Sequence, residues 1–355
     1  MYLKCRKIIL RRSKNHYPNL NMKYKLLYAF IAFVFVGPFC TSSKSIANVS
    51  SISVKLQDTS ALGVLYGKNI NSIGTEQLLT MDIYYPKNAV EGKTYPMVML
   101  MHGGGFLTGS KENMAGPCKQ LADSGFVAVT INYRKGWNAA SRIGGCEGVD
   151  VTGLMLANYR ALQDAHAALR FLAGNAKKYH INPDWMFVGG SSAGAVTALN
   201  VVYLNKEYAA QKFGEAVSSL GSIDRVTNSY TNDFKIKGIC NMWGALPDST
   251  LITKDNALPI ILYHGTADNT VPYDEGPYIS GCNNLPKLYG SANIYRQTIA
   301  AGKPAVLNTA IGGKHGPVEH TRTIMMSNAA CFFHKIMAGK AQSAAYTIVK
   351  PGCGE

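Results

Sequence analysis

The strongest chemical pattern in this 355-residue chain surrounds Ser192, which lies two residues after Gly190 and two residues before Gly194. The run over residues 187–196 reads Phe-Val-Gly-Gly-Ser-Ser-Ala-Gly-Ala-Val and begins with an apolar stretch. A serine in a strained turn between a strand and a helix needs this spacing, because flanking side chains would collide with neighbouring backbone. The adjacent Ser191 lacks a glycine two residues further on. Ser192 is therefore the predicted nucleophile.

Two positions further along the chain could complete a catalytic group with this serine. Asp268 follows an apolar run that ends at Tyr263, and a carboxylate there can hold a histidine and stabilise its cation. His315 stands in the run Gly-Gly-Lys-His-Gly, whose glycines allow a loop to fold over the serine. Serine, acid and base then follow the chain order of α/β-hydrolases. We predict a triad of Ser192, Asp268 and His315.

Alternatives exist for each part of this prediction. The Gly-x-Ser-x-Gly spacing also arises by chance in glycine-rich loops. Asp268 beside Asn269 has the composition of an ordinary turn. His320 competes with His315 as the base, but it falls at the start of a helix expected over 318–337.

Three consecutive glycines follow His102, directly after the apolar run that ends at Met101. Backbone amides aimed at developing negative charge stabilise a tetrahedral intermediate, and glycines let the backbone come within hydrogen-bond distance of it. The run His-Gly-Gly-Gly-Phe over residues 102–106 therefore predicts an oxyanion-binding loop.

The runs His-Gly-Gly-Gly-Phe and Gly-Ser-Ser-Ala-Gly together resemble those of α/β-hydrolase esterases of the hormone-sensitive-lipase and carboxylesterase type. Residues 162–168 and 188–194 make the chain more similar to the secreted bacterial branch with feruloyl and acetyl-xylan esterase-like proteins. The run from His264 to Pro272 also resembles the acid loop of many α/β-hydrolases.

This resemblance assigns roles to further residues. It implies that the backbone amides of Gly104, Gly105 and Ala193 form the oxyanion hole, and that His102 braces the loop without joining the triad. It also favours acyl groups on plant polymers as the substrate.

The order of apolar runs and helical patterns predicts the fold. Alternating residues at 51–56 and 78–85 indicate two opening antiparallel strands. Further strands are expected from short apolar runs at 95–101, 126–131, 185–188, 236–240 and 259–263, with a weaker one at 305–311. Apolar residues at three- and four-residue spacing predict a helix at 159–172. We expect one α/β-hydrolase domain over residues 48–355, with a mostly parallel central sheet flanked by helices.

The first 47 residues have the composition of a leader. They contain nine Lys or Arg and no acidic residue, and a short apolar core at 26–36 follows a basic segment. Ser45 and Ala47 predict cleavage before Asn48, while a lipid anchor on Cys40 is the alternative. We therefore expect a secreted or periplasmic protein without a stable membrane span.

The formal net charge of +15 does not indicate nucleic-acid binding. Residues 48–355 contain 27 basic and 21 acidic residues, a formal charge of only +6. No basic stripe is interleaved with aromatic residues in the sequence.

Six cysteines follow the expected leader: Cys118, Cys146, Cys240, Cys282, Cys331 and Cys353. Disulfides are expected outside the cytosol, and six cysteines allow 15 pairings. We favour pairing of neighbours in the chain, including Cys331 with Cys353, while buried free thiols stay open. No Cys-x-x-Cys spacing is present, so we predict no metal site.

The predicted function is hydrolysis of carboxylic esters through an acyl-enzyme, without a metal or organic cofactor. A serine amidase or peptidase and a non-catalytic hydrolase-like binding protein are the alternatives. Trp137 and Trp243 follow predicted strands and either line the substrate pocket or belong to the core. Specificity is assigned to pocket walls such as 205–233 and 276–289. The sequence leaves the acyl and alcohol groups and the oligomeric state open.

The remaining polar candidates are given structural roles. Asp164 and His166 lie two residues apart on a predicted helix, so they do not face each other and are assigned to packing and capping. His180, His264 and His334 have no spacing that suits a metal site.

Overall fold

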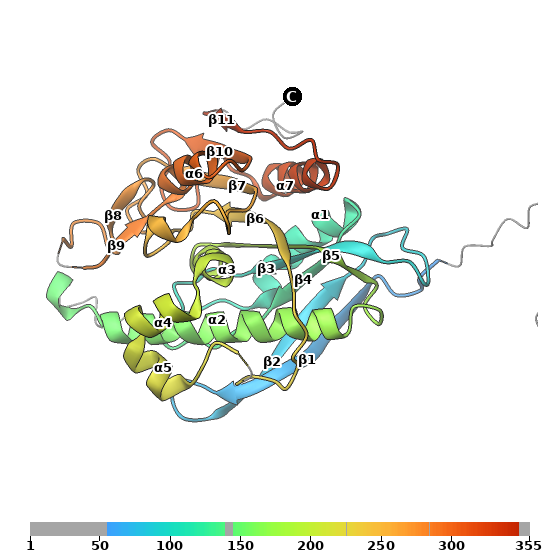
Figure 1. Cartoon of the computed structure of the whole chain (residues 1–355), viewed down its shortest axis with the longest axis horizontal. Coiled ribbons are helices and arrows are strands. Elements are labelled where there is room, and N and C mark those ends of the chain that lie inside the picture. Colours follow the sequence, from blue (N-terminus) through green and yellow to red (C-terminus); the bar gives the residue numbers. More distant parts are fainter. Residues whose placement is uncertain (1–54, 139–144, 225, 284, 348–355) are drawn as a thin grey trace, which may run out of the picture. The chain divides into compact units, whose positions relative to one another are not determined.

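The computed structural model describes residues 55–138, 145–224, 226–283 and 285–347, which form one compact unit (Figure 1). The expected leader, its cleavage site and Cys40 lie outside these residues. The longer strands, in chain order, are β1 (Ser60–Ile70), β2 (Glu76–Tyr84), β3 (Tyr95–Met101), β4 (Val127–Ile131), β5 (Ile181–Ser191), β6 (Ile236–Met242), β7 (Ile260–Gly265) and β10 (Ala305–Ala310). Three short strands are β8 (Glu275–Pro277), β9 (Lys287–Tyr289) and β11 (Ala344–Tyr346). The α-helices are α1 (Ala115–Asp123), α2 (Val151–Gly174), α3 (Ala193–Tyr203), α4 (Lys206–Lys212), α5 (Gly214–Leu220), α6 (Ser291–Ala300) and α7 (Arg322–Met337).

Within the described residues, nine strands form the central sheet in the order β1-β2-β4-β3-β5-β6-β7-β10-β11. The first two pairings, β1 with β2 and β2 with β4, are antiparallel, and every later pairing is parallel. The predicted mostly parallel central sheet is confirmed. Because parallel strands end at one edge, the loops after β3, β5, β7 and β10 gather there.

Helices cover both faces of the sheet (Figure 1). Alternate residues of β3 point to opposite faces, so Met97 and Met99 join the core under α2, α3 and α6. Val98 and Leu100 join the second core, under α1 and α7. Burial on both faces explains why these strands are continuously apolar in the sequence.

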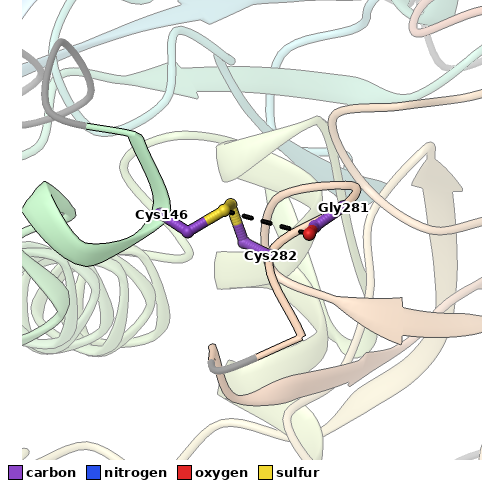
Figure 2. The surroundings of a disulfide bond; sticks show 3 residues. All are labelled: Cys146, Gly281 and Cys282. Carbon is purple, nitrogen blue, oxygen red and sulfur yellow. Dashed lines mark hydrogen bonds between the residues drawn. A yellow bond between two sulfur atoms is a disulfide. The ribbon is translucent and has the colours of Figure 1, made fainter.

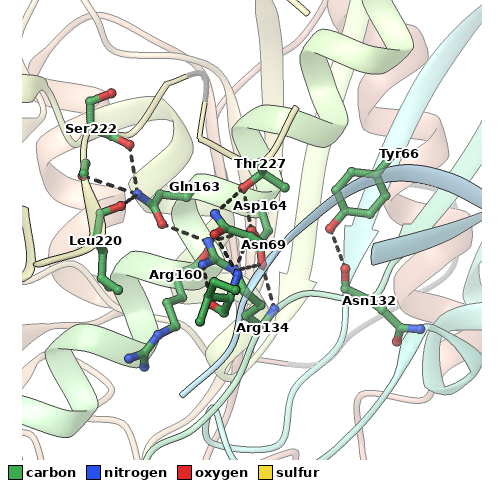
Figure 3. A network of polar contacts seen from close by, with 12 residues as sticks. Tyr66, Asn69, Asn132, Arg134, Arg160, Gln163, Asp164, Leu220, Ser222 and Thr227 are labelled. Carbon is green, nitrogen blue, oxygen red and sulfur yellow. Dashed lines mark hydrogen bonds and ion pairs between the residues drawn. The ribbon is translucent and has the colours of Figure 1, made fainter. Parts of the chain in front are cut away.

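A buried polar network fixes α2 to the loop that follows β4 (Figure 3). The guanidinium of Arg134 pairs with the carboxylate of Asp164 at 2.8 Å, and both side chains are buried. Arg134 also donates to Gln163 Oε1 at 2.8 Å, and Thr227 donates to Asp164 at 3.0 Å. Asp164 thus has the packing role predicted for it. His166 lies 3.4 Å from Asp224.

The opening strand differs from the prediction. The partner of β2 is β1, at 60–70, whereas the expected strand at 51–56 lies largely outside the described residues, and Lys55 forms only an isolated bridge to Val90. Two register shifts in β1 break the alternation that sequence analysis relies on, and Leu62 and Leu65 are exposed. Helix α2 is longer than predicted, and α7 starts at Arg322 after the capping residue Thr321.

Four of the cysteines do not pair as neighbours in the chain. Cys146 is bonded to Cys282, 136 residues away, so the neighbour pairing is wrong for these two (Figure 2). Cys118 and Cys240 are free thiols buried in the second core. Sequence separation predicts pairing poorly because the fold decides which loops meet. The expected partner of Cys331, Cys353, lies outside the described residues.

No helix in the described part of the chain is both long and apolar enough to cross a membrane.

Candidate active site

Ser192 occupies a sharp turn between β5 and α3. Its φ of 53° and ψ of −123° lie in a strained region that the surrounding structure must impose. A Cβ on Gly190 would overlap the backbone of Gly194, and a Cβ on Gly194 would overlap the carbonyl of Met101. The amide of Ser192 donates to the carbonyl of Met242 at 2.9 Å. The two glycines are therefore required by the close approach of backbone segments, as the sequence pattern implies.

The structure brings the three predicted triad side chains together. His315 Nε2 lies 2.8 Å from Ser192 Oγ, and His315 Nδ1 lies 2.7 Å from Asp268 Oδ2. The serine follows β5, the aspartate follows β7 and the histidine follows β10. This arrangement lets Nδ1–H donate to the carboxylate while Nε2 accepts from the hydroxyl.

Asp268 is held as a carboxylate by several donors. Its side chain is fully buried, and Oδ1 accepts from the amides of Thr270 at 2.8 Å and Val271 at 3.0 Å. Burial alone would raise the pKa of Asp268, but hydrogen bonds from His264, His315 and the Val271 amide outweigh it and hold the pKa below its usual range. The carboxylate is therefore charged at neutral pH and can stabilise a histidine cation.

A second histidine contacts the same carboxylate. His264 Nε2 lies 3.1 Å from Asp268 Oδ2 and 3.1 Å from the Val271 carbonyl, and both of these atoms are acceptors. Nε2 must then carry the proton, and Nδ1 accepts from the hydroxyl of Ser291 at 2.8 Å. That hydroxyl in turn accepts from Asn241 at 3.0 Å. Sequence analysis missed this contact, although its signal was present: His264 stands four residues before Asp268.

The glycine loop lies directly against the nucleophile turn. A Cβ on Gly103 would be 3.0 Å from the Ser191 carbonyl oxygen and 3.3 Å from Ser192 Cβ. Gly104 has φ of 112°, and a side chain there would overlap the Thr108 carbonyl. The predicted oxyanion amides of Gly104, Gly105 and Ala193 donate to no acceptor in the described part of the chain. They are available to an oxyanion.

His102 supports this loop from behind. Its ring stacks on Tyr133 with centroids 4.2 Å apart, and Nδ1 donates to the Gly103 carbonyl at 2.7 Å. The Tyr133 hydroxyl donates to the carbonyl of His102 at 2.6 Å. Burial lowers the pKa of His102 to about 4, so the ring is neutral at ordinary pH. These contacts fit the bracing role that the resemblance implies.

A sequence model described as the carboxylesterase family matches residues 37–249. The chain belongs to the carboxylesterase family. The matched region contains the glycine loop and Ser192, whereas Asp268 and His315 lie beyond it. Their assignment rests on geometry.

Curated relatives of this carboxylesterase-family chain match over part of their length. The chain is similar to the cAMP-regulated D2 protein of Dictyostelium discoideum, with 32% identity over 48% of this chain and 31% of the relative. It is 30% identical to Esterase E4 of Myzus persicae, over 46% of this chain and 28% of the relative. The matched segment thus spans less than a third of each relative.

Solved structures share the fold of this family member. A truncated carbohydrate esterase from gut microbiota aligns with a TM-score of 0.52 and 19% identity, covering 80% of this chain and 99% of that one. Esterase 2 of Thermogutta terrifontis, phosphonylated by cyclosarin, aligns with a TM-score of 0.52 and 17% identity over 80% of this chain and 96% of that one. At these identities the likeness establishes the α/β-hydrolase fold alone.

A cavity of about 420 Å³ opens beside Ser192 and His315. Trp137 and Trp243 both line it, so they belong to the pocket and not only to the core. Trp243 has φ of 47° and its ring meets that of His315 edge-on at 6.3 Å. The expected wall 276–289 contributes Tyr278, Ile279 and Leu288, whereas none of the described residues of 205–233 lines this cavity.

The other histidines lie outside the triad. His320 precedes α7 and does not fall within it, contrary to the prediction; its ring is buried against Tyr263, and burial lowers its pKa to about 4. His180 packs edge-on against Tyr85, and His334 lies 2.9 Å from the Ser124 carbonyl. Within the described residues no group of three or more His, Cys, Asp or Glu side chains could hold a metal ion.

Proposed function

We propose that this protein hydrolyses carboxylic esters through an acyl-enzyme on Ser192, with His315 as the base and Asp268 as its partner. The observation that carries the proposal is the continuous relay of hydrogen bonds at 2.8 Å and 2.7 Å, beside three amides without an acceptor in the described chain. Membership of the carboxylesterase family supports it.

The proposed reaction follows from these positions. Ser192 Oγ attacks the ester carbonyl carbon while its proton moves to His315 Nε2, and the carbonyl oxygen becomes an oxyanion. The amides of Gly104, Gly105 and Ala193 stabilise that charge. The carbon–oxygen bond to the alcohol then breaks, and His315 returns the proton to the leaving alkoxide. A water molecule then attacks the acyl-enzyme by the same steps, with His315 again as the base, and the acid is released from Ser192. No cofactor is needed.

We also propose that residues 1–47 are a leader and that residues 48–355 form the mature secreted or periplasmic enzyme. The basic and apolar composition of the leader supports this, as does the Cys146–Cys282 disulfide, since disulfides persist outside the cytosol. N-terminal sequencing of protein exported from a bacterial host should begin at Asn48. A lipid-modified Cys40 would favour the anchored alternative, and an unprocessed cytosolic chain would contradict export.

A panel of esters tests the proposed activity. The purified protein should release 4-nitrophenol from short acyl esters, and acetyl, butyryl, octanoyl and feruloyl esters should then rank its preference. Acyl groups of plant polymers are the proposed natural substrates, and a clear preference for octanoyl esters would count against them. Hydrolysis of aminoacyl amides at a comparable rate would favour an amidase, while no turnover of any ester would favour a binding protein.

A further inference from the structure

The two oxygens of the Asp268 carboxylate have different partners. Oδ1 accepts from the backbone amides of Thr270 and Val271, at 2.8 Å and 3.0 Å. Oδ2 accepts from two imidazole rings, His315 Nδ1 at 2.7 Å and His264 Nε2 at 3.1 Å. A carboxylate has about four lone-pair sites, so these donors fill it. The carboxylate cannot rotate about its Cβ–Cγ bond without losing hydrogen bonds.

The proton on His264 Nε2 is fixed by a chain of hydrogen bonds that begins at Asn241. The amide of Gly244 donates to Asn241 Oδ1 at 3.1 Å, which leaves Nδ2 of this side chain as the donor to Ser291 Oγ at 3.0 Å. The hydroxyl of Ser291 then gives its proton to His264 Nδ1, 2.8 Å away. Because Nδ1 is an acceptor, the neutral ring carries its proton on Nε2, where it faces Asp268.

This chain of hydrogen bonds is shielded from solvent. Asn241 of β6, His264 of β7 and Ser291 at the start of α6 are all fully buried, as is the side chain of Asp268. The ring of Tyr273 packs edge-on against that of His264, with centroids 5.8 Å apart. In such a low-dielectric setting a hydrogen bond to a charged group is stronger than in water. Three elements of the fold therefore act together on one carboxylate oxygen.

We propose that His264 is a positioning residue of the active site, whose Nε2–H holds Oδ2 of Asp268 in line with His315 Nδ1 and shares the charge of that oxygen. The inference rests on the proposed ester hydrolysis and adds to it a residue that acts through the acid. Without this donor the carboxylate would rotate more freely and would align His315 with Ser192 less often. Oδ2 would also carry more charge and would attract the cation of His315 more strongly.

Two polar substitutions separate the donor from the ring that carries it. The amide nitrogen of glutamine extends about as far from the backbone as His264 Nε2, whereas that of asparagine extends only as far as Nδ1. His264→Gln therefore keeps a donor for Asp268, and His264→Asn leaves Oδ2 without it.

Rates on 4-nitrophenyl acetate across pH measure the two effects. His264→Asn should lower kcat by roughly 10–100-fold, the scale of one hydrogen bond to a charged group. The acidic limb of kcat/KM, which reports the essential base of the free enzyme, should move to higher pH by about half a unit or more. His264→Gln should stay within roughly threefold of the wild-type kcat, with the acidic limb in its original place.

His320→Asn is the matched control for loss of a buried imidazole. Its ring packs edge-on against Tyr263, the residue before His264. Burial lowers the pKa of His320 to about 4, so the ring is neutral over the range of the assay. This variant should keep the wild-type rate and pH profile. Equal losses in His264→Asn, His264→Gln and His320→Asn would overturn the inference, and so would wild-type kinetics in His264→Asn.

Nitrogen-15 NMR of the histidine rings in the wild-type protein decides the matter if His264→Asn fails to fold, and it needs no turnover. His264 should carry its proton on Nε2, and the chemical shift of that proton should change as His315 titrates, because both rings donate to Oδ2. A proton on Nδ1 of His264, or an Nε2 proton that does not respond, would overturn the inference. A folded wild-type protein that hydrolyses no ester would overturn the proposed function, and the same spectra would then still decide whether His264 holds Asp268.

Discussion

Two regions at the same edge of the sheet differ in how they are held. The triad side chains follow β5, β7 and β10, which are joined by continuous parallel ladders and flanked by buried helices. The cavity wall at 276–289 is attached through the three-residue strands β8 and β9, a bridge from Leu246 to Tyr289, and the disulfide at Cys282. The contrast supports the proposal that the sheet holds the catalytic side chains in place, while the wall at 276–289 selects which esters fit.

Among changes to the residues at the sheet edge, loss of the proposed nucleophile should lower ester hydrolysis the most. Ser192→Ala should lower kcat for ester hydrolysis by roughly a millionfold, the scale seen when a triad serine is removed. Ser191→Ala is the matched control and should keep most of the activity, since its hydroxyl is not paired with His315. Initial rates on 4-nitrophenyl acetate measure both. A dead Ser191→Ala with an active Ser192→Ala would reverse the assignment.

Replacing Asp268 should lower kcat less than replacing Ser192 does, but far more than replacing a nearby surface carboxylate. Asp268→Asn should lower kcat by roughly 10⁴-fold, because an amide no longer holds the histidine in the required tautomer. Asp274→Asn, six residues further on, alters a surface pair with Arg296 and should change kcat little. The same assay compares them, and equal rates for Asp268→Asn and wild type would show that this carboxylate has no part in turnover.

In the cavity wall, loss of the disulfide should lower the stability of the folded protein. Replacing Cys146 and Cys282 together by serine should lower the free energy of unfolding by about 2–4 kcal/mol, because the bond closes a long loop of the unfolded chain. Ser280→Ala, on the same loop, should change it by less than about 0.5 kcal/mol. Urea unfolding measures both. Unchanged stability in the serine variant would mean that packing alone holds the wall.

A fall in pH should lower the free energy of unfolding through His102, which lies behind the glycine loop. Its pKa falls to about 4 on burial, whereas an exposed histidine titrates near 6.5, so between these values the unfolded chain binds a proton that the folded chain does not. Stability from this neutral ring is full above pH 6.5 and should fall by roughly 1–3 kcal/mol as the pH drops toward 4.

Urea unfolding at several pH values should therefore show a shallower fall between pH 6.5 and 4 for His102→Asn than for wild type. His320, whose pKa burial also lowers to about 4, should continue to contribute in the variant. If the free energy of unfolding fell equally with pH in both proteins, His102 would make no contribution to the pH dependence.

The sequence predicted the side chains that meet at the sheet edge much better than it predicted the contacts of the cavity wall. Ser192, Asp268 and His315 could be located because each follows an apolar run that becomes a buried strand, and parallel strands end together. His264 was missed although it stands four residues before Asp268, because the contact forms only through the turn that brings Asp268 back onto the strand end. The register shifts of β1 likewise removed the alternation on which strand prediction depends.

The wall could not be predicted because it depends on contacts between distant loops. The pairing of Cys146 with Cys282 across 136 residues follows from where α2 begins and where β8 and β9 turn, and neither is encoded by cysteine spacing. A cavity of about 350 Å³ that shares Tyr278 and Leu288 with the one beside Ser192 likewise arises from side chains of α2, α4 and β9, which meet only in the folded chain.

The most direct test of the central claim is the site of covalent labelling by a fluorophosphonate. The serine oxygen attacks the phosphorus of this reagent and fluoride leaves, so the reagent phosphonylates only a serine that is activated by its base. Peptide mass spectrometry of the labelled protein should place one adduct on Ser192, with none on Ser191 and none after His315→Ala. Absence of labelling in the folded wild-type protein, or labelling of a different serine, would contradict the proposed catalytic site.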